Sequence, residues 1–194
     1  PLGLAFDRGE ENIAQVGAGE MVLIYTDGLV ERPGTDLDEG IRQLFDIALV
    51  NAHAQLRAAP ADLAAKVSFI TLYHLILEST LGLTTFKFIT DYLIANQLLP
   101  GFVDGYSKIH QDETRHIGYA VWYLRETIRE HPDQGNTVRR TLRDLLPSVA
   151  ESLKPPGNGA TESVLDISQD DLRQFALDGL TRRLDIIGVP INTL

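Results

Sequence analysis

Three side chains in the second half of the sequence have the residue types and the spacing of metal ligands. Glu113 and His116 form a Glu-x-x-His motif, and side chains three residues apart on a helix lie on the same face. Glu78 follows the apolar run Leu75–Leu77, where an unpaired charge would be costly to bury. A bound metal ion would remove that cost. We therefore predict that Glu78, Glu113 and His116 are metal ligands, with the Glu supplied by one helix and the motif by another, as in di-metal helical bundles.

Four polar side chains lie near this trio in the sequence. Asp112 and Arg115 flank the motif and are predicted to orient the ligands through hydrogen bonds, the alternative being a surface ion pair. His110, one turn earlier, is expected to play such an orienting role or to face solvent. His74 is interpreted as a histidine of the core or of an interface.

The composition restricts both the metal chemistry and the partners. The 194 residues include no cysteine, so a metal must be held by oxygen and imidazole ligands. The net charge of −10 and the lack of a basic run argue against nucleic-acid binding. The hydrophobic fraction of 44% fits a globular protein, which we expect in the cytoplasm. The chain opens at Pro1 without a targeting segment or an initiator methionine, which suggests an excerpt of a longer product.

Two long helices must position the predicted ligands. Helical patterning extends over residues 68–97 and again over 102–131, and the short connection between them predicts an antiparallel pair. The first of these segments is very apolar, but Glu78, Lys87 and Asp91 interrupt it, which argues against a membrane span. Folding the pair about Leu99 leaves Glu78 and Glu113 offset by about seven residues, or roughly 10 Å along the axis. The spacing permits their pairing without requiring it.

The remaining segments predict two more helices and a different beginning. A helix is expected over residues 137–153, kinked or interrupted by Pro147, and another from Ser168 to Ile187, with Asp171 completing a capping box. The first 67 residues instead have an α/β pattern. Met21–Tyr25 is predicted to form a buried strand, and a helix is expected over residues 37–52. The change of pattern places a domain boundary near Lys66, which gives domains 1–67 and 68–194.

The motifs of the second domain resemble a known family. Tyr73–Glu78, Leu99–Phe102 and Asp112–Ile117, with the tail segments Ile167–Asp171 and Arg183–Gly188, are similar to the second half of a ribonucleotide-reductase small-subunit-like protein of the ligand-binding oxidase branch. The resemblance implies a mainly α fold: half of a ferritin-like helical bundle, made of a long antiparallel helix pair and two further helices, preceded by a short α/β fragment.

The resemblance also implies an activity and a cofactor. The family holds manganese with iron, or two irons, and activates dioxygen. A long-chain fatty acid binds beside the metals, and a tyrosine–valine ether cross-link forms near them. Tyr73 matches the cross-linked tyrosine, which makes it the expected catalytic residue.

The chain departs from that family in its number of ligands. The family uses six protein ligands, and three of them belong to a helix pair that should precede Glu78. Glu31, Glu39 and Asp46 lack a Glu-x-x-His partner, so they do not replace those ligands. A second copy of the chain would supply the missing Glu and the missing motif, and we therefore expect a homodimer.

The first segment resembles a second family. Pro1–Leu4 and Gly19–Arg32 are similar to the C-terminal part of a stage-two-sporulation-type metal-dependent serine/threonine phosphatase. The resemblance implies that Asp27, at the end of the predicted strand, is a ligand for Mg²⁺ or Mn²⁺. The family's earlier aspartates would lie before Pro1, and its final Asp-Asp motif is missing after residue 67.

These observations leave three hypotheses open for the function. The first is a di-metal carboxylate oxidoreductase, in which this chain supplies half of the ligands and another chain the rest. The second is a phosphatase-derived regulatory module without chemistry of its own. The third is an inactive fragment or a fusion of two fragments.

Overall fold

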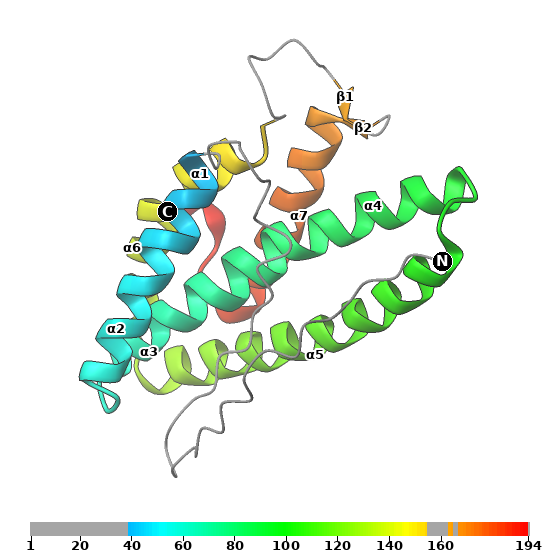
Figure 1. Cartoon of the computed structure of the whole chain (residues 1–194). Coiled ribbons are helices and arrows are strands. Elements are labelled where there is room, and N and C mark those ends of the chain that lie inside the picture. The colour runs from blue at the N-terminus through cyan, green and yellow to red at the C-terminus, as the bar shows by residue number, and fades with distance from the viewer. Residues whose placement is uncertain (1–38, 155–162, 165–166, 194) are drawn as a thin grey trace, which may run out of the picture. The chain divides into compact units, whose positions relative to one another are not determined.

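The structure is a computed structural model that describes residues 39–154, 163–164 and 167–193, and it is mainly helical (Figure 1). Residues 34–194 form one compact unit. Its elements are α1 (Glu39–Arg42), the π-helix η2 (Gln43–Leu49), α2 (Val50–Ala58), α3 (Leu63–Ile70), the π-helix η3 (Thr71–Gly82), α4 (Leu83–Ala95), α5 (Pro100–Glu130), α6 (Gln134–Ser152), the short strands β1 (Ser163–Val164) and β2 (Ile167–Ser168), α7 (Gln169–Ile187) and the 3₁₀ turn η4 (Ile191–Thr193).

The segments α3, η3 and α4 follow one another without a break and form a single helix from Leu63 to Ala95. Asp62 caps this helix, because its carboxylate accepts hydrogen bonds from the backbone N–H groups of Ala64 and Ala65 at 2.8 and 3.3 Å. The sequence pattern predicted a helix that begins at Ser68. The earlier beginning follows from this cap, which satisfies two of the unpaired N–H groups at the helix end.

This long helix is the central helix of the unit. Its middle part, η3, packs against α5, α6 and α7, and Leu72, Leu75 and Ile76 are buried there. Among the described residues it is the one helix long and apolar enough to cross a membrane by length and composition, yet 61% of its apolar window is buried inside the protein. Packing within a helical bundle accounts for that apolar character.

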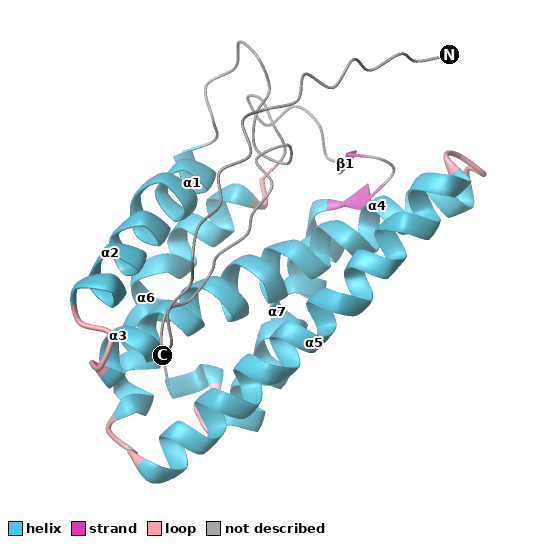
Figure 2. Ribbon diagram, turned by 60° about the horizontal axis from the view of Figure 1, so that its bottom comes forward, coloured by secondary structure: helices cyan, strands magenta, loops and turns pink. Residues whose placement is uncertain are grey.

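The helix α5 lies antiparallel beside the central helix (Figures 1 and 2). The connection is tight, and both Gln97 and Leu99 adopt positive φ angles, of 54° and 45°. Pro100 then occupies the first turn of α5, where its missing N–H costs no helical hydrogen bond. The predicted antiparallel pair is confirmed, with the turn at residues 96–99.

The helix formed by α1, η2 and α2 packs on α6. The two backbones approach so closely that a Cβ added at Gly40 would lie 2.5 Å from the carbonyl oxygen of Ser148 and 2.7 Å from the backbone nitrogen of Ser152. This helix belongs to the compact unit that begins at Gly34. The domain boundary near Lys66 was inferred from sequence patterning alone and stays a prediction.

The last two helices follow the sequence prediction closely. The helix α6 continues through Pro147 to Ser152, so the proline does not interrupt it. At the start of α7, the Ser168 hydroxyl accepts a hydrogen bond from the backbone N–H of Asp171 and donates one to its carboxylate. Gly188 ends this helix with φ 78°. The cap at Ser168 with Asp171 as its partner and the stop at Gly188 are both confirmed, although the Asp171 carboxylate bonds the Ser168 hydroxyl and not its backbone N–H.

Several predictions concern residues outside the described ranges. The strand Met21–Tyr25, the metal ligand Asp27 and the segment Pro1–Arg32 that resembles a phosphatase all lie there. The phosphatase-like α/β fragment therefore stays a prediction.

Candidate metal centre

The structure brings Glu78, Glu113 and His116 together. One ligand atom from each of the three side chains lies within 4.8 Å of the other two. Glu78 comes from η3, and the other two come from the middle of α5. The turn lies at residues 96–99, slightly earlier than expected, which reduces the axial offset predicted from the sequence. The three side chains converge although the two halves of the hairpin are not of equal length.

The wide turns of η3 are accompanied by an unusual side-chain hydrogen bond. Thr80 donates its hydroxyl to the carbonyl oxygen of Leu75, five residues earlier, at 2.6 Å, and both residues are buried. Thr84 and Thr85, in α4, instead donate to carbonyls four residues earlier. Single π turns inside long helices occur frequently at functional sites. Here the π-helix contains Glu78 together with Tyr73 and His74.

The ionised form of Glu113 is disfavoured by its surroundings in the absence of a cation. Burial, and then the negative charge of Glu78, raise the pKa of the Glu113 carboxyl. Its Oε2 atom is buried without a hydrogen-bond partner, although His116 Nδ1 lies 3.4 Å away. A buried carboxylate oxygen of this kind costs free energy unless a proton or a cation neutralises it.

The donor set fits a divalent transition metal. Two carboxylates and one imidazole match the preferences of manganese and iron, which accept oxygen and nitrogen ligands. The unpartnered oxygen of Glu113 is the atom that such an ion would satisfy. The His116 side chain is 56% exposed and that of Glu113 is 26% exposed. The cluster is thus open to the outside at His116 and in part at Glu113, where further ligands have access, whereas Glu78 is largely buried.

Tyr73, the expected catalytic residue, lies next to this cluster. Burial raises the pKa of its hydroxyl to about 12, with the negative charges of Glu78 and Glu113 adding to the rise. Its ring stacks on Phe69, with ring centres 5.8 Å apart and planes at 7°. The phenol is therefore held in one place and kept in its protonated form.

His74 has a role that the sequence analysis did not identify. Its Nδ1 atom lies 2.5 Å from Oε2 of Glu78, and the two side chains are 17% and 12% exposed. The signal in the sequence was the four-residue spacing between His74 and Glu78, which places both on one side of a helix. Its position beside Tyr73 led to the interpretation as a core or interface histidine.

The other predicted residues lie away from the cluster or on its rim. Arg115 donates to Asp112 at 2.5 Å, and these side chains are 77% and 63% exposed, which matches the alternative of a surface ion pair. His110 stacks on Phe86 with ring centres 5.6 Å apart. The described structure therefore pairs these residues with each other or with an aromatic ring, and their role in orienting ligands stays a prediction.

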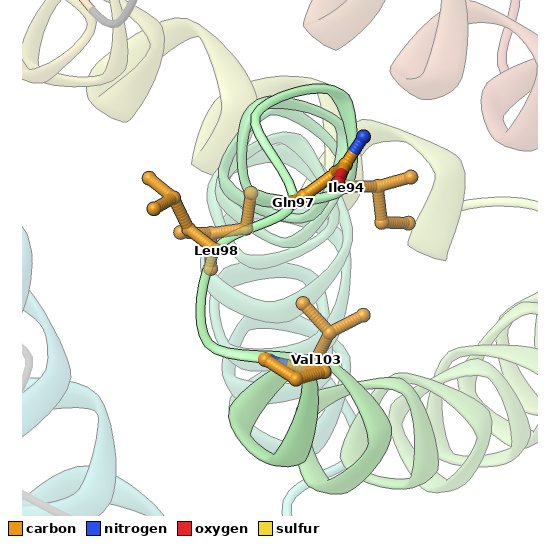
Figure 3. Close-up of a pocket in the computed structure, with 6 residues that line it drawn as sticks. Ile94, Gln97, Leu98 and Val103 are labelled. Atoms are coloured by element: carbon orange, nitrogen blue, oxygen red, sulfur yellow. The ribbon is translucent and has the colours of Figure 1, made fainter.

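An apolar hollow lies at the far end of the hairpin, where α4 meets α5 (Figure 3). Ile94, Gln97, Leu98 and Val103 are among its lining residues. The lining includes no acid, base or nucleophile. Ile94 lies sixteen residues beyond Glu78, which corresponds to roughly 24 Å along a helix. This hollow is therefore separate from the carboxylate–histidine cluster.

Comparison with known proteins identifies the fold. No protein-family model matches the chain. A single-residue variant of an R2-like ligand-binding oxidase, with an anaerobically reconstituted Mn/Fe cofactor, is similar with a TM-score of 0.69 and 23% sequence identity, over 78% of this chain and 54% of that one. An R2-like ligand-binding oxidase from Sulfolobus acidocaldarius is similar with a TM-score of 0.65 and 17% identity, over 77% of this chain and 49% of that one.

These similarities establish a fold shared with R2-like ligand-binding oxidases. The mainly helical, ferritin-like prediction is confirmed at that level. The chain spans about half the length of the solved structures that it matches. That share fits a half-bundle, as the sequence resemblance implied.

Proposed function

We propose that the helical unit is one half of a di-metal carboxylate oxidoreductase of the ligand-binding oxidase type. The observation that carries this proposal is the convergence of Glu78, Glu113 and His116 around a buried, unpartnered carboxylate oxygen. When bound, a pair of manganese and iron ions, or two irons, would supply the redox chemistry that activates dioxygen. The fold shared with oxidases that carry an Mn/Fe cofactor supports this choice of metal.

The residues of the cluster and Tyr73 each have a role in the proposed function. Glu78, Glu113 and His116 would hold the metal. A divalent cation would be favoured there because it would neutralise the negative charges of the two acidic side chains. Tyr73 keeps its proton next to the site, since the pKa of its hydroxyl is about 12. The ether cross-link to a valine stays a proposal, since that valine would lie in the half of the bundle that this chain does not supply.

A second copy of the chain is the proposed source of the other ligands. The sequence contains a single Glu-x-x-His motif, whereas bundles with two metals use two such motifs and two further Glu residues. Two chains related by a twofold axis would provide that set, because a twofold interface presents the same surface from both sides. His116 is exposed on α5, together with the apolar side chains of Ile109 and Tyr119, and this face would meet the partner.

The proposal includes an apolar ligand, with a long-chain fatty acid as the expected kind. Aromatic rings line α4 and α5 toward the turn from the cluster: Phe86 packs on Tyr106 with centres 4.1 Å apart, and Tyr106 on Phe102 at 4.9 Å. Burial raises the pKa of the Tyr106 hydroxyl, which fits an apolar environment. Mass spectrometry of the organic extract of the purified protein would identify such a ligand.

Metal content and oligomeric state test the proposal. The purified chain is loaded with Mn²⁺ and Fe²⁺, excess metal is removed, and metal per chain and molecular mass are measured for the original protein and for Glu113→Ala. We expect about one ion per chain in a dimer, consistent with half of a two-metal site. The Glu113→Ala variant should lose the ion, while an Asp104→Ala control, which changes only an exposed ion pair with Lys108 on the same helix, should retain it.

A monomeric chain without bound manganese or iron would contradict the proposal. Equal metal content in Glu113→Ala and in the original protein would contradict the assignment of the ligands.

A further inference from the structure

His74 and Glu78 form a short, largely buried hydrogen bond beside the cluster. The distance between His74 Nδ1 and Glu78 Oε2 is 2.5 Å. Both side chains lie on η3, four residues apart, and both are largely buried. In a bond to an ionised carboxylate, which only accepts hydrogen bonds, Nδ1 of His74 is the donor.

The imidazole of His74 is itself held by packing. The edge of the Tyr73 ring meets it at 84°, with ring centres 4.9 Å apart. Tyr73 stacks in turn on Phe69, which is 1% exposed and belongs to the core. The ring contacts from Phe69 to Tyr73 and from Tyr73 to His74 therefore link the position of the hydrogen bond to the core of the bundle.

We infer that His74 is a positioning residue that orients Glu78 for metal binding; this inference rests on the function proposed above. The last torsion of a Glu side chain is broad, so a free carboxylate rotates readily. An N–H that engages Oε2 restricts this rotation and gives the other oxygen a defined direction before any ion arrives. Hydrogen-bonding partners of this kind typically change metal affinity by about 10- to 100-fold.

The same geometry separates positioning from direct ligation. The group of side chains with mutually close ligand atoms contains Glu78, Glu113 and His116 and does not include His74. The imidazole contacts the cluster through the Glu78 oxygen. Its removal is therefore expected to weaken the binding of the ion without changing how many ions bind at saturation.

Mn²⁺ titrations of three variants of the full chain test this inference. His74→Leu replaces the imidazole with an apolar side chain of similar size and so removes the hydrogen-bond donor. His74→Asn places an amide N–H donor near the position of Nδ1. His131→Leu is the control, because His131 is exposed at the far end of α5. We expect His74→Leu to bind Mn²⁺ about 10- to 100-fold more weakly, with His74→Asn closer to the original protein and the control unchanged.

Several results would overturn the inference. Unchanged Mn²⁺ affinity in His74→Leu would show that His74 has no role in metal binding. Equally weak Mn²⁺ binding by His74→Leu and His74→Asn would show that the hydrogen-bond donor is not what matters. A lower number of ions per chain at saturation would make His74 a ligand instead. If the original protein binds no Mn²⁺, the proposed function fails together with this inference.

A second measurement needs no variant and keeps the inference testable if His74→Leu does not fold. Long-range ¹H–¹⁵N NMR spectra of the original metal-free protein report which nitrogen of His74 carries a proton. We expect a proton on Nδ1. An unprotonated Nδ1 would contradict the hydrogen bond on which the inference depends, whatever the outcome of the metal titrations.

Discussion

Glu113 destabilises the metal-free fold, and the same property favours the binding of a cation. Burial and the charge of Glu78 raise the pKa of its carboxyl, so the folded chain holds a proton there more tightly than the unfolded chain does. The ionised form therefore destabilises the metal-free fold at neutral pH. A cation in the same place would turn this penalty into affinity.

This account predicts that Glu113→Gln stabilises the metal-free protein while it removes metal binding. The substitution keeps the size and removes the charge, and we expect a gain on the order of 1 kcal/mol, or about 2–4 °C in melting temperature. Thermal unfolding of both proteins in the presence of a chelator measures the effect at pH 7.

The pH dependence fixes the sign of this prediction. A carboxyl with a raised pKa costs no stability once both folded and unfolded states are protonated. The advantage of Glu113→Gln should therefore be present at neutral pH and vanish in acid. A variant that is less stable than the original protein at pH 7 would contradict the electrostatic account of Glu113.

At the residue scale, the sequence predicted the cluster but not its surroundings. Glu78, Glu113 and His116 were recognisable because an acidic residue in an apolar run and a Glu-x-x-His motif are local patterns. The contact of His74 with Glu78 was not predicted, because a helical spacing of four shows only that two side chains share a face. Whether they touch depends on side-chain torsions and on the packing of Tyr73, which no local pattern specifies.

At the scale of elements, the contact between α1 and α6 depends on a glycine. Because a Cβ at Gly40 would collide with the backbone of Ser148 and Ser152, we expect Gly40→Ala to push the helices apart. The expected cost is about 1–3 kcal/mol, measured as a lower midpoint in chemical unfolding.

Gly118 provides the matched control for this substitution. It lies in α5, and a Cβ there would have nothing within 4 Å. Gly118→Ala should stabilise the protein by about 0.5–1 kcal/mol, since alanine is the better helix former. Similar effects of the two substitutions would contradict the close approach of α1 and α6.

The π-helix makes a second prediction at this scale. Thr80 bonds the carbonyl of Leu75 within η3, so Thr80→Val should destabilise the protein by about 0.5–1.5 kcal/mol. Thr85, in the ordinary helix α4, bonds the carbonyl of Leu81 and is partly buried. Because the hydrogen bond of Thr85 is only partly buried, Thr85→Val should have the smaller effect. A lower melting temperature for Thr85→Val than for Thr80→Val would be inconsistent with a special role of this hydroxyl.

The sequence predicted the helices better than their internal geometry. The ends of α7 were clear because Ser168, Asp171 and Gly188 have direct capping chemistry. The π character of η3 was not predicted, because apolar residues at a spacing of three and four fit an α-helix equally well.

At the scale of the whole molecule, the chain matches half of a larger bundle. The solved structures similar to it are about twice as long as the matched part. The number of ligands leads to the same conclusion, because one Glu and one Glu-x-x-His motif are half of the set that two metals require. The homodimer expected from this count stays a proposal, because no residue pattern within the chain specifies the source of the other ligands.

We propose that two copies of this chain together hold a pair of metal ions. Electron paramagnetic resonance of the Mn²⁺-loaded protein tests this proposal, since two manganese ions held close together give an exchange-coupled signal. The account predicts that signal in a dimer at about one ion per chain, and its loss in Glu113→Ala. Only the hyperfine pattern of isolated Mn²⁺, from a monomer or from separate sites, would contradict the claim.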